Sequence, residues 1–279
     1  QEFSPRAEYT FADHDRRAKR RCLEILHAQR QGVRERAYKD LLNLASRVRG
    51  YAWEAIPVLR EYIHPDGAEC FRAQGLAKKL EEAVGILNRV IDQTERRVLR
   101  GESVPAGEKV VSFFEYHTDI IVKSPRETQY GHKVFLTGGR TGLILDCMVE
   151  RGNPSDTSLF PDLIERQEQL YDRPPRQVSA DGGFASQKNL EEGKKRGVKD
   201  VAFAKRKGLS VLDMVKSNWV YKQLKNFRAG IEANISRLKR SFVFSRCDWT
   251  GWLGFQQYGW SALVSYNLLV LARIKLAIA

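Results

Sequence analysis

One stretch, residues 176–207, constrains the fold more strongly than any other. It reads RQVSADGGFASQKNLEEGKKRGVKDVAFAKRK, in which residues 177–180 and 198–204 have the composition of short strands. Between them, Ser186 suits the start of a helix and Gly197 suits its end. A strand, a helix and a second strand in this order form a right-handed unit with parallel strands. The stretch therefore predicts an α/β fold.

Asp181 directly follows the first strand of this unit and precedes Gly182 and Gly183. Functional groups in such sheets gather at the carboxyl ends of strands. The two glycines would let another backbone or a ligand come close. Asp181 is therefore a candidate catalytic residue, although a turn or capping role explains it equally well on this stretch alone.

The composition indicates a globular, basic protein. The chain has 279 residues, 42% of them hydrophobic, which allows one large domain or two modest ones. Its net charge of +13 favours a polyanion, with nucleic acid as the first candidate and an anionic membrane as the second. The four cysteines are far apart, which argues against a zinc site or a disulfide framework and fits a reducing cytoplasm. The apolar segment 258–272 is short for a membrane span and is expected to be a core helix.

The N-terminal part is expected to be helical and basic. Residues 13–49 are rich in Arg and Lys and carry apolar residues at helical spacing, which predicts two amphipathic helices broken near Gly32. A third helix is expected over residues 76–99, and GESVPAGE at 101–108 has the composition of a linker. We predict an all-α region over residues 1–105, a DNA-binding region or linker, before a catalytic domain over residues 106–279. An ordinary helical pair with a solvated cationic face is the simpler interpretation of the charge.

Beyond the linker the hydrophobic period becomes extended. We predict strands at 110–114, 132–137 and 143–150, a helix ending near Tyr171, the parallel unit, and helical regions over 212–244 and 252–278. Gly138 to Arg140 would join the second and third strands as a hairpin. Antiparallel strands followed by parallel additions are the ribonuclease-H-like topology, a mixed five-stranded sheet flanked by helices.

This topology offers three acids from separate elements. Asp119 follows the first predicted strand, Asp181 ends the fourth, and Glu232 lies in a late helix. Phosphodiester cleavage by two divalent ions about 4 Å apart needs carboxylates that converge in this way. Arg228, Glu232 and Lys239 fall on one helical face, which suits a metal ligand beside phosphate-binding cations. A surface salt-bridge ladder explains the same face, and without known neighbours it is the preferred interpretation.

Five segments together resemble the catalytic region of the DDE transposases of bacterial insertion sequences. The likeness covers about residues 105–275. The segments are HTDIIVK at 117–123, YGHKVFL at 130–136, ADGGFAS at 180–186, AFAKRKG at 202–208 and RAGIEANISRLKR at 228–240. Each motif is weak by itself, but their order along the chain makes the resemblance specific.

The resemblance implies a catalytic, metal-binding triad of Asp119, Asp181 and Glu232 that takes Mg²⁺, for which Mn²⁺ can substitute. Arg228 and Lys239 match the family pattern Tyr-x2-Arg-x3-Glu-x6-Lys, whose tyrosine position holds a lysine here. The implied activity is cleavage of transposon ends and strand transfer into target DNA. It implies a homo-oligomer on DNA, in the cytoplasm with the nucleoid and away from membranes.

Several alternatives stay open at this point. Glu115 or Asp146 could replace Asp119 as the first metal ligand. The rival functions are a structure-specific nuclease of the same fold and a DNA-binding derivative that has lost catalysis. Further residues are candidate DNA contacts, each with a structural alternative: Lys205, Arg206 and Lys207 in a basic loop, His117 and His132 near the site, and Trp249, Trp252 and Trp260 as stacking residues.

Overall fold

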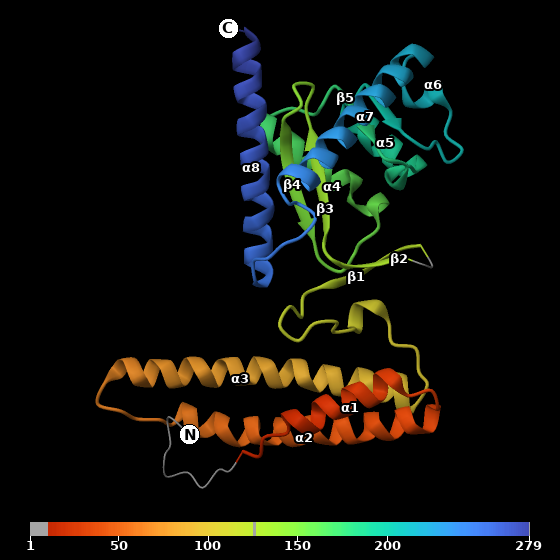
Figure 1. Cartoon of the computed structure of the whole chain (residues 1–279). Helices are drawn as coiled ribbons and strands as arrows, with labels where there is room; N and C mark the ends of the chain where they lie inside the picture. The colour runs from red at the N-terminus through yellow and green to blue at the C-terminus, as the bar shows by residue number, and fades with distance from the viewer. Residues whose placement is uncertain (1–10, 125–126, 279) are drawn as a thin grey trace. The chain divides into compact units, whose positions relative to one another are not determined.

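The computed structural model describes residues 11–124 and 127–278 (Figure 1). Its contacts divide the chain into two compact units, Gln1–Thr118 and Asp119–Ala279. The functional boundary at residues 105 and 106 stays a prediction.

The first unit is helical, as predicted. Its described residues form α1 (Asp15–His27), α2 (Gln31–Arg60), α3 (Gly67–Thr94) and the short turns η1 (Glu95–Leu99) and η2 (Ala106–Glu108). The break between the first two helices falls at residues 28–30, just before the predicted Gly32. The long helices α2 and α3 lie side by side and bury Leu59, Ala73 and Ala77 between them (Figure 1).

The predicted strand at residues 110–114 was wrong. No strand is assigned there, although Val110 is buried as an inward-facing strand residue would be. The side chain of Gln93 on α3 takes the place of a neighbouring strand. Its Nε2 donates to the Val110 carbonyl at 2.9 Å, and the Val110 amide donates to its Oε1 at 2.7 Å. The backbone is satisfied by a side chain, so no ladder forms.

The strands of the second unit form three pairs among the described residues. The hairpin β1 (Asp119–Ser124) with β2 (Glu127–Gly131) and the hairpin β3 (Lys133–Gly138) with β4 (Ile144–Glu150) are antiparallel. The pair β5 (Gln177–Ala180) with β6 (Asp200–Phe203) is parallel. The predicted hairpin and the predicted parallel pair are confirmed. The five-stranded sheet is not, because the ladders stay separate.

Helices pack around these pairs (Figure 1). They are α4 (Asp156–Tyr171), η3 (Gly182–Phe184), α5 (Gln187–Lys195), α6 (Val211–Met214), α7 (Asn218–Ser241) and α8 (Gly251–Ile278). Ser186 caps α5 by accepting from the Asn189 amide at 3.1 Å, as predicted. The helical region expected over 212–244 is two helices, because Val215 is extended and Ser217 begins α7 with its own side-chain cap.

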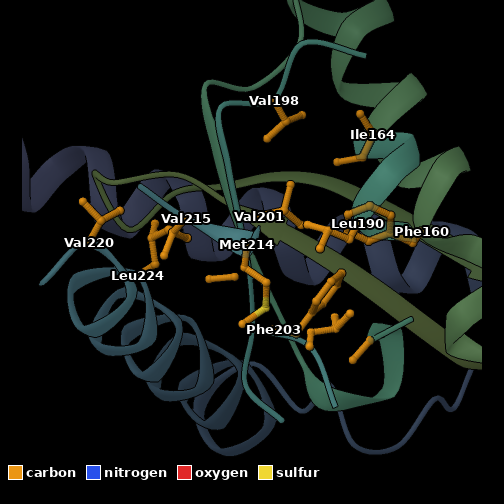
Figure 2. Packing of buried hydrophobic residues seen from close by; sticks show 13 residues of the cluster. Phe160, Ile164, Leu190, Val198, Val201, Phe203, Met214, Val215, Val220 and Leu224 are labelled. Atoms are coloured by element: carbon orange, nitrogen blue, oxygen red, sulfur yellow. The ribbon is translucent and has the colours of Figure 1, made fainter. Parts of the chain in front are cut away.

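Two hydrophobic clusters hold this unit together. One gathers the parallel pair with α4, α5, α6 and α7 around residues such as Phe160, Val201, Phe203 and Met214 (Figure 2). The other packs the β3–β4 hairpin against α7 and α8 through Leu238 and Tyr266. Helix α7 thus belongs to both clusters, which fixes it across the two strand pairs.

Helix α8 has one buried side and one uncovered side. Residues 251–277 are long and apolar enough to cross a membrane by length and composition alone, and 22% of an 18-residue apolar stretch within them is buried. Leu263 and Tyr266 on this helix are almost fully buried against the β3–β4 hairpin. This packing fits the core helix that the sequence predicts.

Candidate active site

Asp181 lies where the sequence places it, at the carboxyl end of β5. Its Oδ1 accepts the Gly182 amide at 2.6 Å and so caps η3, while the side chain stays 69% exposed. The turn is tight because Lys205 crosses it: a Cβ atom on Gly182 would lie 2.7 Å from the Cβ of Lys205. The glycine therefore lets the chain after β6 pass directly over the Asp181 turn.

Glu232 and Asp181 meet at one cation. Arg228 and Glu232 lie one turn apart on α7, and the Nη1 of Arg228 is 2.7 Å from the Glu232 carboxylate. The same nitrogen lies 3.7 Å from Asp181 Oδ1. The predicted ion pair between Arg228 and Glu232 is therefore present, and Arg228 also contacts the carboxylate of Asp181, which lies at the end of β5.

Asp119 is held by a separate set of contacts. It is the first residue of β1, and both its carboxylate oxygens are 3.0 Å from the Gly152 amide. The Nδ1 of His132 lies 2.9 Å from its Oδ2. The His132 ring is 2% exposed and lies edge-on to Trp252 and Phe255. His132 therefore packs against Trp252 and contacts Asp119.

The structure brings together two of the three predicted acids. Asp181 and Glu232 share Arg228, whereas the contacts of Asp119 are with Gly152 and His132. Within residues 11–124 and 127–278, no group of three or more His, Cys, Asp or Glu side chains is placed to hold a metal ion. The donor chemistry still fits Mg²⁺, because carboxylate oxygens are its preferred protein ligands and two of them already converge on a positive group.

The two rival first ligands have other partners. Asp146 is 3% exposed and is bound at both oxygens by Arg166 of α4, at 2.6 and 2.7 Å. This ion pair raises the pKa of the Arg166 guanidinium, so the arginine keeps its charge and anchors α4 to β4. Glu115 lies 2.8 Å from His117 in the first unit. Asp119 as the first ligand stays a prediction.

The predicted DNA-contacting cations are on the surface. Lys205, Arg206 and Lys207 follow β6 and are exposed, and Lys239 is exposed on α7. The stem of Lys205 lies across Gly182, so this lysine belongs to the Asp181 turn. Lys207, the last of the three basic residues after β6, has a left-handed backbone conformation with φ 47°.

The sequence interpretation missed the contribution of Lys133 and Asp156. By sequence alone Asp156 suits only the start of a helix, and it is the first residue of α4 after the capping Ser155. The structure also places its carboxylate against Gly183 and 3.0 Å from the Lys133 Nζ. A polar turn after a predicted strand was the visible signal, but the sequence does not say which residues this turn contacts.

Comparison with known proteins agrees with the resemblance. The family described as the transposase DDE domain matches residues 120–268, which is more than half of the chain. The chain therefore belongs to the DDE transposase family, and its general function is that of a transposase that acts on DNA. The match includes Asp181 and Glu232 and begins directly after Asp119. Neither the curated proteins nor the solved structures contain a match to it.

Proposed function

We propose that the chain cleaves transposon ends and joins the freed 3′ end to target DNA, with Asp119, Asp181 and Glu232 as the ligands of Mg²⁺ or Mn²⁺. The observation that carries the proposal is the convergence of Asp181 and Glu232 on Arg228. The exposed carboxylates of Asp181 and Glu232 come from elements far apart in the chain and both lie next to the Arg228 guanidinium. Such an arrangement of carboxylates can bind a metal cation. The order of strand pairs and helices supports a ribonuclease-H-like arrangement of this unit.

In this proposal the residues of the chain bind and orient the phosphodiester. The bound ion would stabilise charge on the attacking and leaving oxygens. Arg228, Lys239 and the loop of Lys205, Arg206 and Lys207 would neutralise the phosphates on either side of the scissile bond. Pairing of two DNA ends would require a homo-oligomer, acting in the cytoplasm on nucleoid DNA.

The test uses a labelled duplex taken from the DNA that flanks the reading frame, with Mg²⁺ or Mn²⁺. Asp181→Asn and Glu232→Gln should each lower both cleavage and joining by at least about 100-fold, the loss typical when a charge-stabilising group is removed. Asp162→Asn is the matched control, because Asp162 is an exposed acid on the outer part of α4. It should leave both steps unchanged.

The same assay separates the alternatives. Cleavage without joining by the wild-type chain would identify a nuclease, and a mobility shift without cleavage would identify an inactive DNA-binding derivative. Full metal-dependent activity in Asp181→Asn would show that the assigned acids are not the ligands.

A further inference from the structure

Residues 152–157 comprise most of the connection between β4 and α4 and the first two residues of α4, and this segment contacts groups next to both Asp119 and Asp181. At its start the Gly152 amide donates to the Asp119 carboxylate, with both oxygens at 3.0 Å. Asn153 Nδ2 donates to the carbonyl of Ile120, the residue after Asp119, at 3.3 Å. The start of this segment is therefore tied to the first residues of β1.

The end of the same segment, at the first residues of α4, is tied to the turn that follows Asp181. Thr157 Oγ1 donates to the Gly183 carbonyl at 2.8 Å. The Asp156 carboxylate lies so close to the Gly183 Cα that a Cβ atom there would collide with Asp156 Oδ2. Gly183 belongs to η3, which Asp181 caps. One short segment thus spans from the first acid to the second.

A neighbouring pair of residues makes a second link between the same two places. His132 contacts Asp119, and Lys133, the next residue, donates its Nζ to Asp156 Oδ1 at 3.0 Å and to the Pro154 carbonyl at 2.8 Å. The side chains of Lys133 and Asp156 are 25% and 36% exposed, so this ion pair is partly shielded from water. Lys133 fixes the direction of Asp156, and Asp156 lies against the turn.

We infer that residues 152–157 and Lys133 form a brace that sets the position of the Asp181 turn relative to Asp119. Lys133 and Asp156 are then positioning residues for the metal-binding acids, through contacts that touch neither DNA nor metal. The inference rests on the proposed function. Its physical basis is that groups behind the ligands of a metal orient them, and their loss typically weakens metal binding about 10–100-fold.

The test measures Mn²⁺ binding to the full chain without DNA, from the electron paramagnetic resonance signal of free Mn²⁺. Lys133→Met and Asp156→Asn should each weaken binding about 10–100-fold. The double variant should be no weaker than the more affected single variant, because both break one ion pair. Lys133→Arg should recover part of the loss.

The sign of the Lys133→Met effect separates positioning from simple electrostatics. Removing a positive charge near a cation site would by itself strengthen Mn²⁺ binding, whereas loss of the brace weakens it. Asp248→Asn is the matched control, because Asp248 forms an exposed ion pair with Arg246 at 3.0 Å. It should bind Mn²⁺ as the wild type does.

Circular dichroism of each variant gives its folded fraction. A loss of binding that merely follows the folded fraction, or wild-type binding by Lys133→Met and Asp156→Asn, would overturn the brace. Asp181→Asn and Glu232→Gln are measured alongside. If these two also bind Mn²⁺ normally, the proposed metal site itself fails; if they lose binding while the brace variants do not, only the brace fails.

Discussion

Arg228 makes one contact that its sequence spacing predicts and a second that it does not. Its spacing from Glu232 predicts an ion pair on the helix surface, and the pair is there at 2.7 Å. An exposed pair of this kind contributes little, typically about 0.3–0.5 kcal/mol. The second contact of Arg228, with Asp181 at the end of β5, is indicated by no helical pattern.

Gly182 is the residue whose replacement the geometry restricts most directly. A Cβ atom there would lie 2.7 Å from the Cβ and 2.9 Å from the Cγ of Lys205, which are near the backbone and move little. We expect Gly182→Ala to lower the free energy of unfolding by about 1–3 kcal/mol, as overpacking usually does. Urea denaturation followed by circular dichroism measures this.

Gly230→Ala provides the control for that experiment. Gly230 lies inside α7 with nothing within 4 Å of an added Cβ atom. Alanine there should raise the free energy of unfolding by up to about 1 kcal/mol, because glycine is the poorer helix former. Similar effects of the two substitutions would contradict the close approach of Lys205.

At the scale of elements, α1 is attached to α2 through one acid. Asp40 on α2 is contacted by Arg17 and Arg21 of α1, the second at 2.6 Å. The hydrogen bonds from Arg17 and then Arg21 lower the pKa of Asp40 to about 2 from an ordinary 3.8. Helix α1 buries no residue of its own, so these ion pairs are important for its attachment.

The lowered pKa predicts a loss of stability in acid. The Asp40 carboxylate stabilises the folded state fully above pH 3.8, and this contribution is lost as the pH falls through about 2. The pairs are partly exposed, so we expect a contribution of about 0.2–1 kcal/mol each. Urea denaturation at pH 2 to 5 should show this slope reduced in Asp40→Asn, and an unchanged slope would contradict the assignment.

The position of α7 is decided by packing of the element as a whole. Val220 and Leu224 join the cluster around the parallel pair, and Leu238 joins the cluster of the β3–β4 hairpin. The Tyr221 hydroxyl donates to the Phe203 carbonyl at 2.9 Å, which ties α7 to the end of β6. These contacts bring Glu232 to the strand ends that carry Asp181.

For the whole molecule, the net charge of +13 predicts DNA binding that weakens steeply with salt. Each phosphate contact adds about 0.9 to the slope of log affinity against log salt concentration. If Lys205 contacts a phosphate, Lys205→Ala should reduce that slope by about 1. Fluorescence anisotropy with a labelled duplex at several salt concentrations measures it.

Lys195→Ala is the matched control for the salt experiment. Lys195 is an exposed lysine at the last residue of α5. The turn that follows Asp181 precedes the first residue of the same helix, so the length of α5 separates the two. Lys195→Ala lowers the net charge by the same amount as Lys205→Ala and should leave the slope of log affinity against log salt concentration unchanged. A slope that falls by the same amount in both variants would show a general effect of charge and no contact at Lys205.

Local patterns in the amino-acid sequence predict most of the elements and the family. The β3–β4 hairpin, the parallel pair and the Ser186 cap depend on periodicity and on residues a few positions apart, and they lie where the patterns predict. The helices of the first unit are also present, but α2 continues to Arg60 and α3 begins at Gly67, beyond their predicted bounds. The ordered motifs gave the family that the comparison shows. Such features need no knowledge of distant neighbours.

Contacts between residues far apart in the chain depend on how the elements pack, and local patterns do not predict them. Residues 110–114 have the sequence pattern of a strand, but the side chain of Gln93 bonds the backbone of Val110 and no ladder forms there. Likewise, the packing of α7 brings Arg228 to Asp181, and the β4–α4 connection brings Gly152 to Asp119. These contacts join residues far apart in the chain, so they depend on how whole elements pack and not on any local pattern.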